Sequence, residues 1–432
     1  MSRWMYVFLL FALLAPIFDI LHFPSILIFI VAGLGILPLA ALIGQSVERI
    51  AEHTGERVGG LLFATFGNAT ELIIGIFALS QGLVDVVRAS IIGSILGNVL
   101  LVLGVSVCVG GFKYGRLPFE TRHANQYGSL LALCIGGLLL PSVAQLLAAH
   151  EQQAQIVERG VVLSDFIAVV LLLGYIASIL FSVFRIGVKK SEDEFDPVLG
   201  ARSEAAIERL LAYRQHLSHS TQPGKSGILR QLDNAMEVIA RHEAGHTAGQ
   251  TAEKQAGSEQ TSVQHAEKHE TEKKMPARKS FPWLALVWLA LATAGVAWLS
   301  DILVGAIEPV TVQLHWNAAF VGLIFVPLIG GLPEYFNTIS MVLDKRMGMV
   351  LAASAGSSIQ IALLMAPILV LVSLFMPHRL DLVFSVVELA VLGLATFLFS
   401  EITKDGELVW LEGLLLILLY GMMGGTVFLF GS

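Results

Sequence analysis

Long apolar runs dominate this chain and leave it few ways to fold. About eleven of them reach the roughly 20 residues that an α-helix needs to cross a lipid bilayer. They lie near residues 4–20, 24–45, 60–80, 86–110, 127–148, 161–184, 282–303, 316–343, 347–375, 381–400 and 409–430. Of the 432 residues only 14% are charged, whereas a soluble domain has about 25%. We therefore expect an all-α, polytopic integral membrane protein with about 11 transmembrane helices.

A polar segment at residues 185–281 interrupts the apolar pattern. It is rich in Glu, Gln, Lys, His, Ser and Ala, and its part from Ala244 to Lys279 has almost no apolar side chains. A segment of this composition cannot bury enough apolar surface to form a core of its own. We interpret it as a polar linker that divides the membrane part into six spans and five.

The basic residues predict how the chain is threaded through the membrane. With a cytoplasmic N-terminus, the connections on the cytoplasmic side carry Arg49, Arg57, Lys113, Arg116, Arg122, Lys189, Lys190, Lys345, Arg346 and Lys404. Those on the other side then carry only Arg88, Arg159 and Arg379. Lys and Arg concentrate in the cytoplasmic loops of membrane proteins. We therefore expect the N-terminus and the linker to be cytoplasmic, and the short loops favour a prokaryotic plasma membrane.

Two acidic side chains lie deep within apolar runs, one in each half of the chain. Glu71 follows Gly67, and Glu334 follows Gly330 and Pro333. A charge at membrane depth costs several kcal/mol, and its default interpretation is a functional site. Gly and Pro allow a helix to break, which exposes backbone carbonyl oxygens near each carboxylate. Together these features predict a cation-binding site inside the membrane.

The surroundings of the two glutamates match at one offset. Glu71 and Glu334 are 263 residues apart, and the same offset places Gly93-Ser94 on Gly356-Ser357 without a gap. A match of this kind indicates an internal repeat with one glutamate in each copy. If each copy has five spans, the second enters the membrane from the opposite side. Inverted repeats place transport sites near the midplane, where the copies meet.

The predicted domain organisation follows from this repeat. Residues 24–184 form the first five-helix repeat and residues 282–432 form the second. The linker at 185–281 joins them, and residues 1–23 form an additional N-terminal transmembrane helix.

Oxygen-bearing side chains accompany the glutamates in both halves. Besides Glu71 and Glu334 as direct ligands, the candidates for the supporting site are Asn68, Asn98, Gln360, Ser94 and Ser357. Hard cations such as calcium bind six to eight oxygen atoms. The apolar runs contain no clustered thiols or imidazoles, which softer metals prefer. Glu388, in the tenth run, is a further candidate for supporting the ion pathway.

Electrostatics predicts that such a site also binds protons. Two carboxylates roughly 5 Å apart, at an effective dielectric of about 20, repel each other by about 3 kcal/mol. The loss of hydration disfavours the charged forms as well. We therefore expect the empty site to retain at least one proton near neutral pH, so that a cation has to displace protons in order to bind.

A second pattern in the chain belongs to a different class of protein. His242, Glu243 and His246 match the His-Glu-x-x-His motif, in which two histidines on one helix face bind zinc and the glutamate acts as general base. Here Gly245 interrupts the motif, and nothing in the surrounding linker could wall a cleft. A membrane-tethered zinc hydrolase is therefore the less favoured alternative.

The segments around both glutamates resemble a known family. Residues 59–73, 89–104 and 356–361 are similar to signatures of the cation/proton exchangers, the CAX-type Ca2+/H+ antiporters of the calcium/cation antiporter superfamily. The layout of one helix plus five plus five agrees with that family as well. The resemblance covers nearly all of the membrane part.

The resemblance carries expectations about activity. It implies export of calcium driven by proton uptake, with Glu71 and Glu334 as alternating carriers of the cation and the protons. It also implies that Asn68, Asn98 and Gln360 support the site. The partners would be an inorganic cation, protons and the lipid bilayer, with no nucleic acid and no cofactor. The oligomeric state, the stoichiometry and the role of the linker are left open.

The second glutamate's neighbourhood departs from the family pattern, which is usually Asn-Ala-Ala-Glu-His. Gly331 stands where an amide is expected, and Tyr335 stands where a histidine is expected. The site is thus one oxygen ligand short, and a titratable imidazole is missing. Calcium remains the favoured ion, and a sodium or potassium/proton antiporter on the same scaffold remains the alternative.

Overall fold

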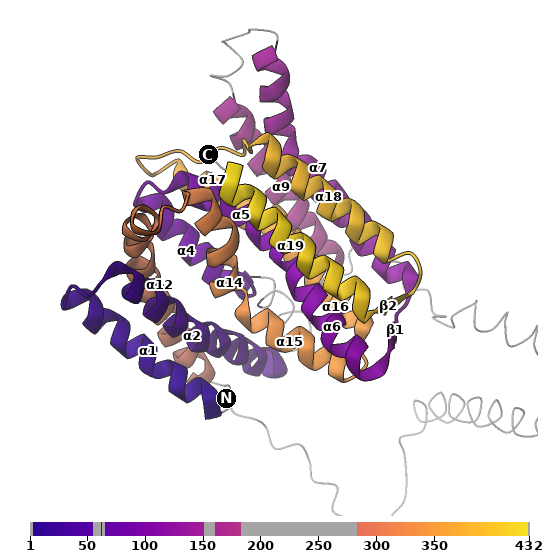
Figure 1. Cartoon of the computed structure of the whole chain (residues 1–432), viewed down its shortest axis with the longest axis horizontal. Helices are drawn as coiled ribbons and strands as arrows, with labels where there is room; N and C mark the ends of the chain where they lie inside the picture. Colours follow the sequence, from indigo (N-terminus) through magenta and orange to yellow (C-terminus); the bar gives the residue numbers. More distant parts are fainter. Residues whose placement is uncertain (1–2, 55–61, 63–64, 151–159, 183–282, 431–432) are drawn as a thin grey trace, which may run out of the picture. The chain divides into compact units, whose positions relative to one another are not determined.

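The computed structural model describes residues 3–54, 62, 65–150, 160–182 and 283–430, which form a bundle of helices (Figure 1). The first half contains α1 (Arg3–Ile20), α2 (Ser25–Thr54), α4 (Ala69–Ser80), α5 (Val84–Leu96), η1 (Gly97–Val102), α6 (Leu103–Tyr114), β1 (Arg116–Pro118), α7 (Thr121–His150) and α9 (Gly160–Ser182). The second half contains α12 (Trp283–Leu314), α13 (Ala318–Phe320), η2 (Val321–Phe325), α14 (Val326–Gly330), α15 (Leu332–Leu343), α16 (Met347–Gln360), η3 (Ile361–Met365), α17 (Ala366–Ser373), α18 (Val386–Ile402), β2 (Glu407–Val409) and α19 (Trp410–Phe430). The η segments are single stretches of π-helix within longer helices.

Each predicted apolar run contains helix, and the expected class of a helical membrane protein is confirmed. Among the described residues, seven helices are long and apolar enough to cross a bilayer, or eight if the bent segment from Ala318 to Leu343 counts as one span. Two further apolar helices, at Val7–Ile20 and Ala69–Ser80, are shorter. The count of eleven spans and the domain boundaries remain predictions, and the linker at 185–281 lies outside the described residues.

Equivalent helices of the two halves run in opposite directions. The beginning of α5 lies beside the chain that follows α17, because Arg88 pairs with Asp381 at 2.7 Å. The Tyr114 hydroxyl donates to the carbonyl oxygen of Leu343 at 2.6 Å, which places the end of α6 beside the turn between α15 and α16. The helix pair α5–α6 is therefore antiparallel to its counterpart α16–α17, as an inverted repeat requires.

The connections between helices fall into two groups, one at each end of the bundle. At one end, β1 and β2 pair antiparallel and join the α6–α7 connection to the α18–α19 connection. At the other end, Arg379 binds both carboxylate oxygens of Asp165 at 2.7 Å. Arg116 thus lies at the first end, and Arg88 and Arg379 lie at the second. Which end is cytoplasmic remains a prediction.

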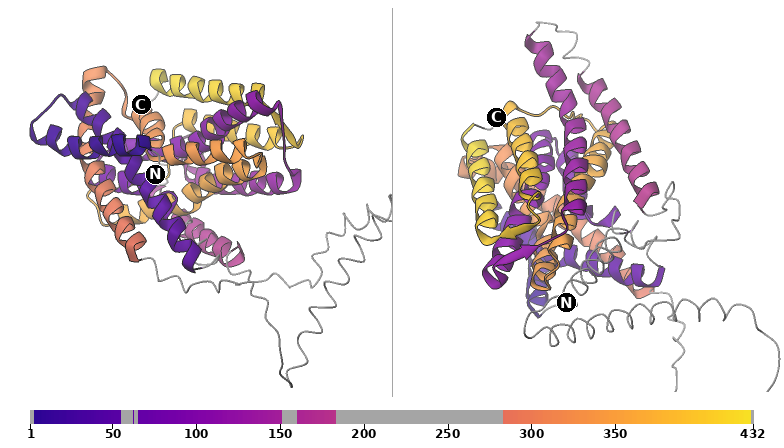
Figure 2. Two further views of the ribbon diagram at one scale, coloured as in Figure 1. Left: turned by 90° about the horizontal axis from the view of Figure 1, so that it is seen from below. Right: turned by 90° about the vertical axis from the view of Figure 1, so that its right-hand side faces the viewer.

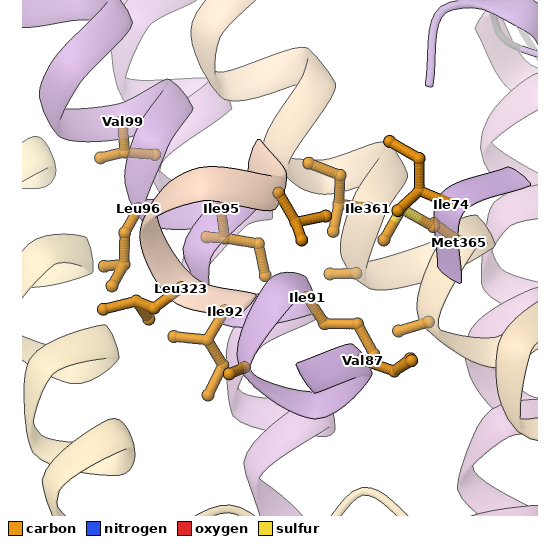
Figure 3. Packing of buried hydrophobic residues seen from close by; sticks show 14 of the residues in the cluster. Ile74, Val87, Ile91, Ile92, Ile95, Leu96, Val99, Leu323, Ile361 and Met365 are labelled. Atoms are coloured by element: carbon orange, nitrogen blue, oxygen red, sulfur yellow. The ribbon is translucent and has the colours of Figure 1, made fainter. Parts of the chain in front are cut away.

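The helix α5 lies at the centre of the bundle. A helix that is apolar on all sides is stable only when other helices surround it, and Ile91, Ile92, Ile95 and Leu96 of α5 are each at most 1% exposed. They belong to one apolar cluster with Leu323 of η2 and with Ile361 and Met365 of η3 (Figure 3). The helix α2 packs against α1 and α12, and these three form one side of the bundle (Figure 1, Figure 2).

Two glycines let the halves touch backbone to backbone at this centre. A β-carbon added to Gly93 of α5 would lie 2.2 Å from the carbonyl oxygen of Leu323, and one added to Gly322 of η2 would lie 2.3 Å from that of Val86. No side chain fits in either position. Inside a bilayer the hydrophobic effect does not drive helices together, because lipid tails are as apolar as the helices. Small residues let two helices approach closely and gain van der Waals contact instead.

The second half contains a bent helix at the level of Glu334. α14 ends at Gly330 and α15 begins at Leu332. The axis of the continuous helix Ala318–Gly330 differs from that of α15 by 57°. Pro333 is near the first position of α15, where its missing N–H costs nothing because that position has no helical acceptor. The sequence signals for a broken helix are thus confirmed at this site.

The Gly93 contact predicts a stability difference between two matched variants. Gly93→Ala should lower the Tm of the purified protein by about 2 °C or more, because overpacking a close contact costs about 1–3 kcal/mol. Gly356→Ala is the control, since Gly356 is the repeat equivalent of Gly93 and its added β-carbon meets no atom within 4 Å. Thermal unfolding in detergent measures the Tm of each variant. Equal changes in Tm for the two variants would contradict the close contact proposed between Gly93 of α5 and η2.

Candidate functional site

Glu71 and Glu334 occupy the same position in two short helices. Each is the third residue of its helix, Glu71 in α4 and Glu334 in α15. Glu71 is 4% exposed and Glu334 is half-buried. The first turn of a helix carries unpaired N–H groups and the positive end of the helix dipole. Both carboxylates are therefore placed where the backbone offsets part of the cost of burying a negative charge.

The two carboxylates meet across the glycine pair at the bend. A β-carbon added to Gly330 would lie 2.7 Å from Cγ of Glu71, so the side chain of Glu71 fills the space that glycine leaves. A β-carbon added to Gly331 would lie 3.7 Å from Oε1 of Glu71 and 3.7 Å from Oε2 of Glu334. The two oxygens therefore lie within twice that distance of each other. The structure therefore brings together the two glutamates that the repeat relates, and their role as a shared binding site stays a prediction.

Two hydrogen bonds bring three of the predicted supporting residues to the site. The hydroxyl of Ser357 donates to Oε1 of Glu334 at 2.7 Å. Nδ2 of Asn68 donates to Oε1 of Gln360 at 3.0 Å, which joins the residue before α4 to the end of α16. Asn68 is at the N-cap position of α4, but its side chain does not cap the helix. Its amide is instead directed towards the other half of the chain.

Among the described residues, three of the predicted site residues of the first half each have a buried oxygen atom without a hydrogen-bond partner. These atoms are Oδ1 of Asn68, Oε2 of Glu71 and Oγ of Ser94. A fourth such oxygen of the first half, Oε1 of Gln145, belongs to none of the predicted site residues. An unsatisfied buried polar group costs about 1–3 kcal/mol. Oxygen atoms left open in this way are suitable ligands for a hard cation. The donor set of the first half thus fits the cation that the sequence predicts.

The halves differ in how serine and glutamate are arranged. Ser94 follows Glu71 at the spacing of 23 residues that separates Ser357 from Glu334. Ser357 is bonded to its glutamate, whereas Ser94 is not. The second carboxylate is therefore held by its own half, and the first half keeps its oxygens free.

Asn98 and the neighbouring serines lie where α16 crosses α5 and η1. Asn98 is 5% exposed and belongs to η1. Its carbonyl oxygen accepts a hydrogen bond from Ser354, and the carbonyl oxygen of Ile95 accepts one from Ser358 at 3.3 Å. These two serines of α16 therefore join this helix to α5 and η1 by hydrogen bonds. π-Helical segments such as η1 and η3 are frequent at functional sites, and η3 begins one residue later in the second repeat than η1 does in the first.

Metal-binding clusters of another kind are absent from the described residues. In the described part of the chain no three His, Cys, Asp or Glu side chains gather closely enough to hold a metal ion. The remaining ligands of a cation at Glu71 and Glu334 therefore have to be neutral oxygens. His242, Glu243 and His246 of the alternative zinc motif lie outside the described residues.

Glu388 does not join the central site. The sequence predicts a tenth span from residue 381, but α18 begins only at Val386. The preceding segment is extended, because the N–H groups of Leu382 and Phe384 donate to the hydroxyls of Ser164 and Ser142 at 3.1 and 2.9 Å. Backbone groups that lipid cannot satisfy are thus satisfied by protein.

Glu388 lies in the first turn of α18, at the end of the bundle that carries Arg88. Its carboxylate accepts from the N–H of Ser385 at 2.8 Å, and the hydroxyl of Ser385 accepts from the N–H of Glu388. The pair forms a capping box, which satisfies two N–H groups at a helix start. Glu388 therefore has a structural role in addition to the predicted pathway role, which stays a prediction.

Two features of the site escape analysis of the sequence. The sequence marks Gly330 and Gly331 as a helix break. It does not show that the side chain of Glu71, 259 residues before Gly330, occupies the space beside Gly330. Tyr335 lies close enough to Tyr420 of α19 and to Glu334 to interact electrostatically with both. Nothing in the sequence pattern connects Tyr420 with the second repeat's glutamate.

Comparison with known proteins agrees with this arrangement. The sequence model of the sodium/calcium exchanger protein family matches residues 24–184 and 284–429. A Ca(2+)/H(+) antiporter of Aphanothece halophytica is 31% identical over 94% of this chain and 91% of its own length. The Ca(2+)/H(+) antiporter ChaA of Bacillus subtilis is 30% identical over 96% of both chains.

Solved structures agree as well. The structure of native YfkE matches 98% of this chain and 99% of its own, with a TM-score of 0.69 and 28% identity. The crystal structure of the H+/Ca2+ exchanger CAX has a TM-score of 0.60 at 11% identity, which shows a shared fold. With its paired acidic half-helices and this match over most of its length, the chain belongs to the sodium/calcium exchanger protein family.

Proposed function

We propose that this chain is a secondary antiporter that exports a cation, with calcium favoured, in exchange for protons. Glu71 and Glu334 bind the cation and the protons in turn, and Asn68, Asn98, Gln360, Ser94 and Ser357 support them. The observation that carries the proposal is the meeting of the two carboxylates across Gly331. The Ca(2+)/H(+) antiporters among the relatives support the choice of ions.

The chemistry follows from burying two like charges together. With both carboxylates ionised, the empty site carries two uncompensated negative charges in a medium of low dielectric, which is strongly unfavourable. A divalent cation neutralises both, and so do protons. The site therefore has two favourable loaded states and one unfavourable empty state. If only loaded states change their access from one membrane face to the other, each cation outward requires protons inward.

The choice of ion depends on the number of oxygens. Besides the carboxylates, the free Oδ1 of Asn68 and Oγ of Ser94 are available as neutral ligands, and the broken helix adds backbone carbonyls. Calcium accepts such mixed oxygen shells. The repeat equivalent of Asn68 is Gly331, which offers no oxygen from a side chain. This one missing ligand is the observation that keeps a monovalent-cation/proton antiporter as the second candidate.

The location follows from the helices and the basic residues. The protein is integral to a membrane, and we place the N-terminus and the linker at 185–281 on the cytoplasmic side of a prokaryotic plasma membrane. The face with β1 and β2 is then cytoplasmic, and the face with Arg88 and Arg379 is external.

Transport in reconstituted vesicles tests the proposed ions and carriers. With an imposed pH gradient and a proton-sensitive dye, added calcium should move protons, and Glu71→Gln or Glu334→Gln should each abolish this movement. Sodium, potassium and manganese are added in separate runs. A response to sodium alone would favour the second candidate. Full transport by either variant would refute its carrier role, and peptidase activity lost in Glu243→Gln would favour a hydrolase.

Competition between calcium and protons gives a pH dependence of known sign. Protonated carboxylates have no charge with which to hold a cation, so the half-saturating calcium concentration should rise as the pH on the calcium-binding face is lowered. Initial rates at a series of calcium concentrations and pH values measure it. A half-saturating concentration that does not change with pH would mean that protons bind elsewhere.

The space left by Gly330 predicts a variant that moves Glu71 without removing it. Gly330→Ala places a β-carbon 2.7 Å from Cγ of Glu71, so the carboxylate has to shift, and transport should fall about tenfold or more because a misplaced ligand loses its coordination. Gly348→Ala in α16 is the control, since its β-carbon meets no atom within 4 Å. Vesicle transport and Tm together separate this effect from misfolding; normal transport by Gly330→Ala would contradict it.

A further inference from the structure

A polar cavity opens near the Arg88 end of the bundle, away from the central carboxylates. Its volume is about 220 Å³, and its polar lining is Asp85 and Arg88 of α5 with Ser385 and Glu388 at the start of α18. Ala319 and Val427 are among its apolar walls. At about 30 Å³ for each molecule, a cavity of this size holds roughly seven waters. None of its lining residues belongs to the site proposed above.

The carboxylate of Glu388 is the reactive group of this cavity. Glu388 is 7% exposed, and its Oε2 accepts the N–H of Ser385. In the described part of the chain Oε1 has no hydrogen-bond partner, and the carboxylate has no cationic partner. Glu388 is thus a largely buried acid with one oxygen uncommitted, beside a space for water.

The other charged groups around Glu388 are already paired. Arg88 binds Asp85 at 3.0 Å and Asp381 at 2.7 Å, so its charge is compensated by two carboxylates. Among the described residues, Asp85 and Arg88 of α5 share the cavity lining with Glu388, and Asp381, in the segment before α18, is reached through its ion pair with Arg88. The elements α13 and α19 contribute Ala319 and Val427, and the nearby part of α7 contributes Ser142; none of these is charged.

These surroundings favour a proton over a metal ion as the occupant. A divalent cation needs several oxygen ligands, but no three acidic, histidine or cysteine side chains of the described residues gather closely enough to bind a metal. A single carboxylate beside water can take up a proton without any further ligand.

Two helices lead from the cavity to the central site. Along α5, Ser94 follows Arg88 by six residues, or about 9 Å. Along α19, Tyr420 precedes Val427 by seven residues, or about 10 Å. The Tyr420 hydroxyl is 3.4 Å from the carbonyl oxygen of Leu323, and Tyr420 interacts electrostatically with Tyr335, which also interacts with Glu334. Tyr335 and Tyr420 therefore lie near the second carboxylate, and Tyr420 is on α19, the helix that also lines the cavity with Val427.

We propose that Glu388 is the proton acceptor at the mouth of the pathway on the Arg88 face. A hydronium ion in the cavity gives its proton to the Glu388 carboxylate and becomes water. The neutral acid then passes the proton inward, by way of the hydroxyls of Tyr420 and Tyr335, to the carboxylate of Glu334. Glu388 is ionised again at the end of the transfer. This inference rests on the proposed exchange of a cation for protons.

Glu388→Gln tests the transfer with little disturbance of the fold, because glutamine keeps the acceptor oxygen of a capping box. In vesicles with the Arg88 face outward, internal pH and calcium are held constant, and the external pH is varied. The proton concentration that gives half-maximal calcium transport should rise at least severalfold, while the half-saturating internal calcium stays unchanged. Tyr420→Phe should lower the maximal rate without moving the half-maximal proton concentration.

Two controls separate proton uptake from helix capping. Glu412→Gln alters a glutamate that accepts the N–H of Val409 at 2.7 Å in the first turn of α19, at the other end of the bundle. Ser385→Ala removes the hydroxyl of the capping box and leaves the carboxylate of Glu388 in place. Both should keep the wild-type dependence on external pH.

Three results would overturn the inference. They are an unchanged external pH dependence in Glu388→Gln, an equal shift in Ser385→Ala, or a change in the affinity for calcium on the Arg88 face without a change for protons. Failure of the proposed exchange is seen separately, as wild-type protein that moves no calcium against protons, and it would remove this inference as well.

Discussion

The mutual repulsion of two buried carboxylates is the constraint on which the rest of this structure depends. Glu71 and Glu334 come from opposite halves of the chain and meet beside Gly331. Inside a bilayer neither charge can be left uncompensated. Three features offset this repulsion. Both glutamates lie in the first turns of half-helices, and Ser357 donates a hydrogen bond to Glu334. Asn68 and Ser94 each leave an oxygen atom free to bind a cation.

Glycine makes the meeting of the carboxylates possible. Gly93 and Gly322 bring the backbones of α5 and η2 into contact at the centre, and Gly330 leaves the space in which the side chain of Glu71 lies. A side chain at any of these positions would push the halves apart or displace a carboxylate. The antiparallel arrangement of the two repeats then gives the site one wall from each half, and a pathway from each membrane face becomes available to it.

Much of the site could be predicted because charge and repetition are visible in a sequence. The offset that relates Glu71 to Glu334 also relates Ser94 to Ser357. The free-energy cost of placing a glutamate inside a membrane identifies both glutamates as functional candidates from the sequence alone. The start of α18 could not be predicted, because the apolar residues before Val386 resemble a membrane helix. Their N–H groups are satisfied by Ser142 and Ser164, which only the folded chain brings near.

The central claim is that one pair of carboxylates binds either the cation or protons. It is tested most directly by counting the protons released when calcium is added to the purified protein in weakly buffered detergent solution. The account predicts that the wild-type chain releases protons as calcium binds, and that the double variant Glu71→Gln with Glu334→Gln releases none. Calcium binding without proton release, at every pH at which the protein is folded, would contradict it.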